Sequence, residues 1–246
     1  MPLFNYYPPK SGNNDPELEK KIFRHSLVFP SLFLLAFWLI FLVETTLDFE
    51  FAVYGIFPLR YEGLKGILFS PFIHSGYKHL AANSLPFFVL SLALFYFYRK
   101  LAYRIFILIY FLSGLCVWLG GRDAWHIGAS GIIYGLASFL FFSGIFRNDV
   151  KLLTIAIIVV FLYGSMFWGI FPLKPEVSWE SHLWGGASGF LLSIYYRKQG
   201  PQRQHYEWED EPDDEDEQQE QEITNGKTGD LFDTKHEKNE QILNLR

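Results

Sequence analysis

A serine with small neighbours is the first feature of this chain that could do chemistry. Ser130 stands in the segment Gly128-Ala129-Ser130-Gly131, and Tyr134 follows it by one helical turn. A serine becomes a nucleophile when a neighbouring base removes its proton. In a membrane helix, however, Gly and Ser also let two backbones pack closely. The segment alone fits both interpretations, so the polar residues that reach the same place must decide between them.

Residues suited to assist a serine stand at the beginning of two other apolar stretches. His79 and Asn83 are four residues apart, so they project from one face of a helix. Together with the backbone N–H of Ser130, they are donors that could stabilise an oxyanion. His182 opens a later stretch and could accept the proton of a serine as a general base. This set of residue types indicates nucleophilic catalysis.

Glycines follow both the serine and the later histidine at helical spacing. Each pair gives its helix a stripe without side chains: Gly131 and Gly135 in one helix, Gly185 and Gly189 in the other. Two such stripes let helix backbones come close, which would bring Ser130 and His182 within hydrogen-bonding reach. We expect Glu180 to face water, so a dyad is predicted rather than a triad. The ring of Tyr134 is expected to pack on the imidazole.

The elements that must carry these residues are membrane helices. Half of the 246 residues are hydrophobic, and several long runs carry no charge. The sequence predicts an all-α polytopic membrane protein with six spans, at residues 26–47, 78–98, 102–119, 127–145, 152–171 and 180–196. The connection over residues 48–77 is too polar and broken to span the bilayer, yet too apolar for a free loop. We expect it to lie partly in the bilayer interface.

The two ends of the chain differ from the membrane domain, which we place at residues 26–197. Residues 1–25 are predicted to be a cytoplasmic leader and residues 198–246 an acidic, disordered cytoplasmic tail. Residues 201–246 hold 15 acidic and 5 basic residues, and the run over 207–222 is too charged to fold. Cys116 is the single cysteine, so no disulfide forms within the chain and a zinc–cysteine site is excluded.

Basic residues predict the orientation of the spans. Eleven lie on the side of the two termini and five on the other side, which puts both termini in the cytoplasm. The second, fourth and sixth spans then begin at the outer side, so His79, Ser130 and His182 lie at a similar depth. Polar groups are costly inside a membrane. Their gathering at one level favours a site over scattered packing residues.

In their order along the chain, these residues resemble the rhomboid intramembrane serine proteases over roughly residues 26–197. The motifs that carry the resemblance are His74-x4-His79-x3-Asn83, Gly128-x-Ser130-Gly131 with Tyr134, and His182-x2-Gly185-x3-Gly189. The resemblance implies a six-helix bundle with a long membrane-associated first loop. It also implies an endopeptidase that cuts transmembrane protein substrates within membrane lipid, with no cofactor, metal or nucleic acid. The expected location is a bacterial inner membrane.

The family's roles carry over to matching positions of this chain. The resemblance implies that Ser130 is the nucleophile and His182 the general base. It also implies that His79 and Asn83 donate to the oxyanion, and that Tyr134 stacks on the histidine.

The first loop carries one match and one departure, and a second departure lies in the next span. His74 matches a family position with a structural role in this loop. Rhomboids commonly carry Trp-Arg eight or nine residues before that histidine, where this chain has Lys65-Gly66. Many also carry a glutamate and a glycine late in the second span, where this chain reads Leu-Phe-Tyr-Phe-Tyr over residues 94–98. Both departures concern loop docking and helix packing rather than the proposed chemistry.

Two other hypotheses stay open. One is a metal-binding or transport site, because imidazole and carboxylate are metal ligands and several such groups lie near the outer side: His74, His79, Asp123, His126 and His182. No HExxH spacing is present, however, and a surface or loop-anchoring role is favoured for His126. The other hypothesis is an inactive family member that binds transmembrane segments. Insensitivity to chelators would argue against the metal site, and labelling by a serine-reactive probe would argue against the inactive binder.

Overall fold

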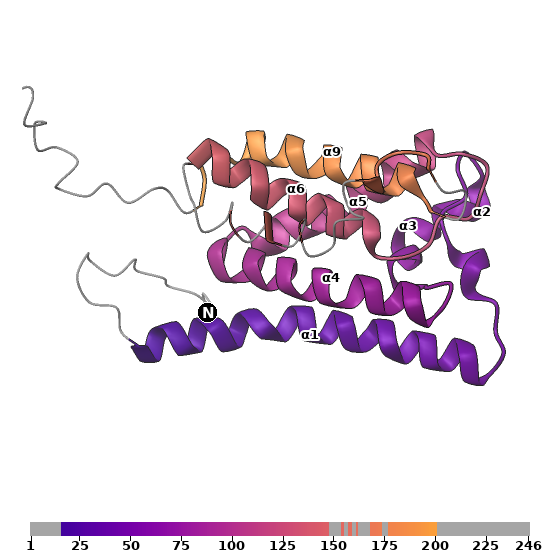
Figure 1. The fold of residues 1–246 in the computed structure, drawn as a ribbon, viewed down its shortest axis with the longest axis horizontal. Helices are drawn as coiled ribbons and strands as arrows, with labels where there is room; N and C mark the ends of the chain where they lie inside the picture. Colours follow the sequence, from indigo (N-terminus) through magenta and orange to yellow (C-terminus); the bar gives the residue numbers. More distant parts are fainter. Residues whose placement is uncertain are drawn as a thin grey trace, which may run out of the picture. The chain divides into compact units, whose positions relative to one another are not determined.

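The computed structural model describes residues 16–147, 154, 157, 158, 161, 168–173 and 177–200, all within one compact unit, Met1–Arg203. Its long helices are α1 (Pro16–Thr46), α4 (Tyr77–Phe97), α5 (Ala102–Gly120), α6 (Ser130–Arg147) and α9 (Trp179–Tyr195), shown in Figure 1. The predicted span at 152–171 lies largely outside the described residues, although residues 154, 157, 158, 161 and 168 are helical. Residues 1–15 of the predicted leader and 201–246 of the predicted tail also lie outside them.

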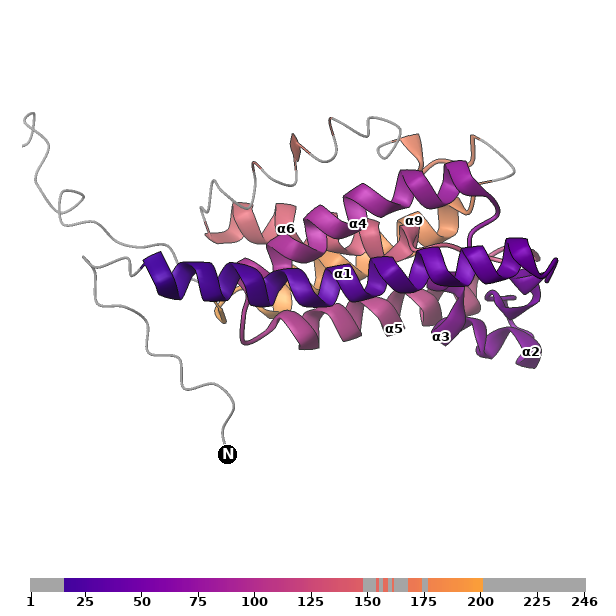
Figure 2. The ribbon, with the colours of Figure 1, turned by 90° about the horizontal axis from the view of Figure 1, so that it is seen from below.

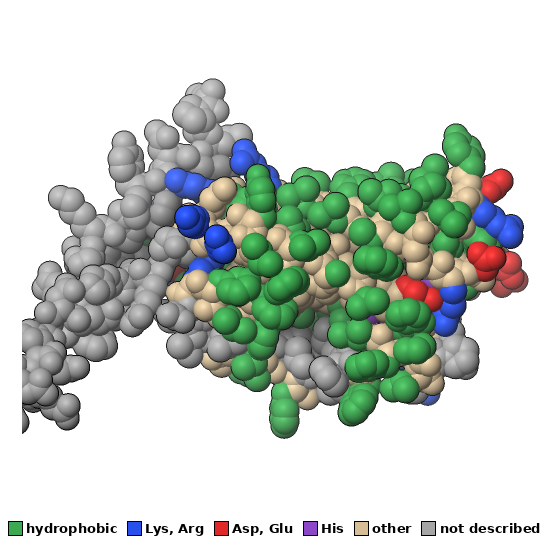
Figure 3. Space-filling model, turned by 90° about the horizontal axis from the view of Figure 1, so that it is seen from above, with side chains coloured by type: hydrophobic (Ala, Val, Ile, Leu, Met, Phe, Trp, Pro, Cys, Tyr) green, Lys and Arg blue, Asp and Glu red, His purple; other side chains and the backbone are tan. Residues whose placement is uncertain are grey.

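Four of these helices, α1, α4, α5 and α6, are long and apolar enough to cross a membrane. On α1 an exposed apolar stripe repeats every three or four residues, through Val28, Leu32, Leu35, Leu39 and Leu42. Such a stripe without protein cover faces lipid in a membrane helix. Figure 3 shows a broad apolar band, with charged side chains gathered toward the two ends of the described part. The prediction of an all-α polytopic membrane protein is confirmed.

The first helix begins at Pro16, ten residues before the expected start at residue 26. Glu17 and Glu19 in its first turn suit the positive end of the helix dipole. Glu19 also accepts a hydrogen bond of 2.8 Å from the Tyr96 hydroxyl and lies 3.5 Å from the Arg99 guanidinium. The polar composition suggested a leader, but these contacts dock the extra turns onto the end of α4.

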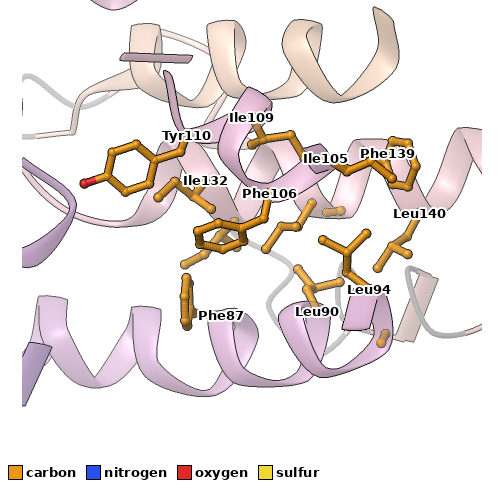
Figure 4. Packing of buried hydrophobic residues seen from close by; sticks show 14 of the residues in the cluster. Phe87, Leu90, Leu94, Ile105, Phe106, Ile109, Tyr110, Ile132, Phe139 and Leu140 are labelled. Carbon is orange, nitrogen blue, oxygen red and sulfur yellow. The ribbon is translucent and has the colours of Figure 1, made fainter. Parts of the chain in front are cut away.

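α6 lies at the centre of the bundle and packs against α9, α5 and α4. α1 runs along one side, next to α4 (Figure 2). Figure 4 shows the core, in which buried side chains from three helices interdigitate: Phe87, Leu90 and Leu94 of α4, Ile105, Phe106 and Ile109 of α5, and Ile132, Phe139 and Leu140 of α6. Van der Waals packing of this kind drives helix association inside a bilayer.

Glycines bring the backbones of α6 and α9 into direct contact. A Cβ atom at Gly185 would fall on the carbonyl oxygen of Gly131, and one at Gly189 on that of Gly135. No side chain larger than hydrogen fits at either α9 position without moving a backbone. The close approach predicted from the glycine spacing is therefore confirmed.

The long first connection is folded into four short helical turns: η1 (Phe51–Tyr54), α2 (Tyr61–Leu64), α3 (Gly66–Phe69) and η2 (Ser70–Phe72). Gly66 packs so closely that a Cβ atom there would meet the carbonyl of Gly55. The Lys65 ammonium lies 4.4 Å from the ring centre of Tyr54. Lys65 and Gly66 thus make their own docking contacts where the family commonly has Trp-Arg. Large apolar side chains remain exposed here, among them Leu59, Tyr61, Leu68 and Phe69, as suits a membrane interface.

Candidate active site

A cavity of about 840 Å³ opens at the end of the bundle where α4, α6 and α9 begin. It is lined by five of the residues that the sequence singled out, Ser130, His182, His79, Asn83 and Tyr134. They come from three helices that are far apart in the chain. A concave site with a few convergent polar groups is the usual form of a binding or catalytic pocket.

Ser130 is the first residue of α6, and its position depends on the turn before it. Gly128 has a φ of +101°, a left-handed conformation that side chains disfavour, and its N–H donates to the Ser70 carbonyl at 2.8 Å. A Cβ atom at Gly128 would lie 2.7 Å from two ring atoms of His79. The turn therefore presses the start of α6 against α4. It leaves Ser130 at a helix N-terminus, where free backbone N–H groups favour negative charge.

His182 lies in the first turn of α9 and is held from two sides. Its Nδ1 is 2.7 Å from the carbonyl oxygen of Gly169. A carbonyl can only accept, so Nδ1 carries the proton and Nε2 keeps a free lone pair. The Tyr134 ring is stacked on the imidazole, with centroids 4.1 Å apart and planes 5° apart. These contacts fix both the tautomer and the plane of the ring.

Gly169 was not among the site residues predicted from the sequence. The carbonyl of this residue occupies the place where an acid stands in a triad. No pattern could have identified it, because the interacting group belongs to the backbone and the residue has no side chain to signal it.

Neighbouring atoms show how closely the starts of α6 and α9 approach. A Cβ atom on Gly131, the residue after the serine, would lie 3.2 Å from the carbonyl of Ser181, the residue before the histidine. Ser130 and His182 are both only 8% exposed, and both line the cavity. The arrangement has the components that a histidine needs to take a proton from a serine.

His79 and Asn83 lie on the same face of α4, beside the Gly128 turn. The Asn83 amide nitrogen is buried and has no hydrogen-bond partner among the described residues. Buried donors are almost always paired, so an unpaired one in a cavity suits a ligand oxygen. His79 is oriented by a contact of 3.2 Å between its Nδ1 and the Ser75 hydroxyl.

His74 lies behind this site rather than in it. Its ring is 2% exposed and packs 5.1 Å from the ring of His79 and 5.5 Å from that of Phe37. Burial, with a smaller contribution from the nearby His79, lowers the pKa of His74 from 6.5 to about 3. The ring is therefore neutral at physiological pH and supports His79 from within the first connection.

We had expected Glu180 to face water, but the structure buries this residue, which is only 2% exposed. Its carboxylate points to the connection between α5 and α6, where it lies 3.5 Å from the Arg122 guanidinium. The expectation was wrong because it considered only the position of Glu180 near a membrane surface. In the structure that connection folds over the first turn of α9.

Of the surface and loop-anchoring roles predicted for His126, the structure shows the anchoring one, since the residue is buried. Its Nε2 lies 3.1 Å from the Arg122 carbonyl and its Nδ1 lies 2.6 Å from the Ser178 hydroxyl. Burial lowers the pKa of His126. With both ring nitrogens engaged, this histidine is a poor metal ligand. Within the described ranges no three His, Cys, Asp or Glu side chains are grouped as they would be to hold a metal ion.

Comparison with known proteins identifies the family. The Rhomboid domain model matches residues 62–199. The uncharacterized protein Rv1337 of Mycobacterium tuberculosis is 32% identical over 181 residues, covering 70% of this chain and 75% of the other. The protein named "Putative rhomboid protease YdcA" of Bacillus subtilis is 31% identical over 137 residues, covering 50% and 62%. This chain belongs to the rhomboid family, and its fold is a rhomboid-type helical bundle.

Proposed function

We propose that this protein is an intramembrane serine endopeptidase that uses a Ser130–His182 dyad. The observation that carries the proposal is the arrangement of His182. Its Nδ1–H donates a hydrogen bond to the Gly169 carbonyl, and its ring is stacked on Tyr134 in the cavity that Ser130 also lines. Nε2 is thereby left as the base.

In the proposed reaction the Ser130 hydroxyl attacks a peptide carbonyl carbon and its proton passes to Nε2 of His182. The carbonyl oxygen becomes an oxyanion, which the Asn83 amide, the His79 ring and the N–H at the start of α6 stabilise. Collapse of this intermediate breaks the C–N bond, and the proton on His182 moves to the leaving amine. Water then hydrolyses the acyl-enzyme by the same route in reverse.

The proposed substrates are transmembrane segments of other proteins. A helical peptide bond is shielded by its own hydrogen bonds, so a segment must unwind before Ser130 can reach it. We expect a preference for Gly, Pro or other poor helix formers near the outer membrane surface. With the orientation predicted from basic residues, the cavity faces outward and both termini are cytoplasmic, in a bacterial inner membrane.

A fluorophosphonate serine probe tests the proposal in detergent-solubilised protein. Wild type should be labelled, and the label should map to Ser130 by peptide mass spectrometry. Ser130→Ala and His182→Ala should not be labelled, and a chelator should change nothing. If folded wild type resists the probe, the inactive binder becomes the better account of this chain. If labelling is lost on chelation, the metal hypothesis returns.

A further inference from the structure

A buried charge lies beside the proposed base. Glu180 is the second residue of α9, is 2% exposed, and neither carboxylate oxygen has a hydrogen-bond partner among the described residues. Its ion pair with Arg122, at 3.5 Å, is long for a strong pair. Burying a carboxylate with so few partners costs free energy. A helix N-terminus offsets part of that cost, but the placement calls for a function.

The surroundings of Glu180 form a clasp, which we define as Arg122, His126, Ser178 and Glu180. The Arg122 guanidinium donates to the Val177 carbonyl at 2.9 Å. His126 donates from Nε2 to the Arg122 carbonyl, so its Nδ1 accepts from the Ser178 hydroxyl. Ser178 is the N-cap of α9. The clasp thus joins the connection between α5 and α6 to the turn that carries His182.

Glu180 can influence His182 through charge but not through a direct bond. The two residues are two positions apart, so their side chains leave the helix in different directions, with Cα atoms about 5.4 Å apart. The ring is otherwise faced by His79 from α4, Tyr134 from α6 and the Gly169 carbonyl. Glu180 is the acidic residue in the first turn of α9, the turn that also carries His182. In this setting Glu180 is the negative charge that favours an imidazolium.

We propose that Glu180, held by the Arg122 clasp, is a positioning residue that fixes the first turn of α9 and stabilises the imidazolium formed at His182. The inference rests on the proposed function. The proton of the Ser130 hydroxyl goes to Nε2 of His182, while Glu180 gains no proton and supplies only charge. Two groups thereby divide the roles that one acid has in a triad. The Glu180 carboxylate stabilises the positive charge on His182, and the Gly169 carbonyl orients the ring.

The test measures the titration of His182 without requiring catalysis. In a Ser130→Ala background, the rate at which diethyl pyrocarbonate modifies His182 is followed against pH by peptide mass spectrometry. We expect Glu180→Gln to move the midpoint down by about 0.5–1 pH unit and Arg122→Gln to move it up. The Glu180→Gln/Arg122→Gln double variant should lie near wild type. Glu62→Gln, which removes an exposed carboxylate, should leave the midpoint unchanged.

Fluorophosphonate labelling of the same substitutions with Ser130 intact separates this inference from the proposed function. Glu180→Gln should slow labelling about three- to tenfold at neutral pH. If wild type is labelled but the midpoints do not move, or if both single variants move the midpoint in the same direction, the role of Glu180 is overturned and the proposed protease is not. Opposite shifts in a protein that the probe never labels would overturn the protease and leave the charge effect standing. A purely structural clasp predicts lower stability with no change of midpoint.

Discussion

α1 and α6 are held in the same bundle by opposite means. In the most apolar 18-residue window of each helix, 17% of the residues are buried in α1 and 61% in α6. α1 docks through large aromatic rings. The ring centroids of Phe29 and Phe95 are 4.5 Å apart, and those of Phe37 and Phe87 are 4.9 Å apart. α6 meets α9 backbone to backbone through glycines. Rings can shift to accommodate a change, but a backbone contact cannot. The helices that carry the site are therefore the ones that tolerate least.

The largest expected effect comes from the glycine contact. Gly185→Val should abolish labelling of Ser130 and destabilise the protein by about 3 kcal/mol, because its Cβ atom would fall on the Gly131 carbonyl. Gly186→Val is the matched control, since a Cβ atom at Gly186 meets nothing within 4 Å. Thermal unfolding in detergent and probe labelling measure both effects. Equal tolerance of the two substitutions would show that the α6–α9 contact is not tight.

A smaller effect is expected at the turn before the serine. Gly128→Ala introduces a Cβ atom 2.7 Å from the His79 ring at a φ of +101°, so we expect labelling to fall about 100-fold, as for the loss of an oxyanion donor. Gly76→Ala serves as control, because its φ of 164° is extended and a Cβ atom there meets nothing within 4 Å. If Gly128→Ala were labelled at the wild-type rate, His79 would have no part in the reaction.

The third prediction concerns pH and the part of the first connection behind the site. His74 has a pKa of about 3 in the folded protein and 6.5 as its ordinary value. The unfolded state therefore binds more protons between these values, and His74 lowers stability progressively as pH falls from about 6.5 toward 3. His74→Gln should flatten this part of the stability curve, measured by thermal unfolding at each pH. An unchanged slope would mean that His74 is not buried as the structure has it.

The smallest effect is expected at the N-terminal end of α1. Glu19→Gln weakens the contacts to Tyr96 and Arg99, which are partly exposed and screened by solvent. We expect less than about 1 kcal/mol of stability to be lost and labelling of Ser130 to stay at the wild-type rate. A loss of activity here would contradict the contrast between α1 and the α6–α9 pair.

Much of this architecture could be predicted from residue types and spacing. Long apolar runs specify helices, and the glycine spacing specified which two helices touch. Prediction failed where a side chain responds to a distant segment. Residues 16–24 were predicted to be a polar leader because the contact between Glu19 and Tyr96 could not be foreseen. Glu180 was predicted to be exposed because its ion pair with Arg122 could not be foreseen. The carbonyl of Gly169 leaves no trace in the sequence, since every residue carries one.

Cleavage in a membrane tests the proposed Ser130 protease most directly. Wild type and Ser130→Ala would each be reconstituted into liposomes with a single-span reporter that carries Gly and Pro near its outer end. Wild type should release a fragment cut near that end, Ser130→Ala should release none, and a reporter with Leu and Ala at those positions should be cut more slowly. Equal cleavage by Ser130→Ala would contradict a mechanism in which Ser130 is the nucleophile.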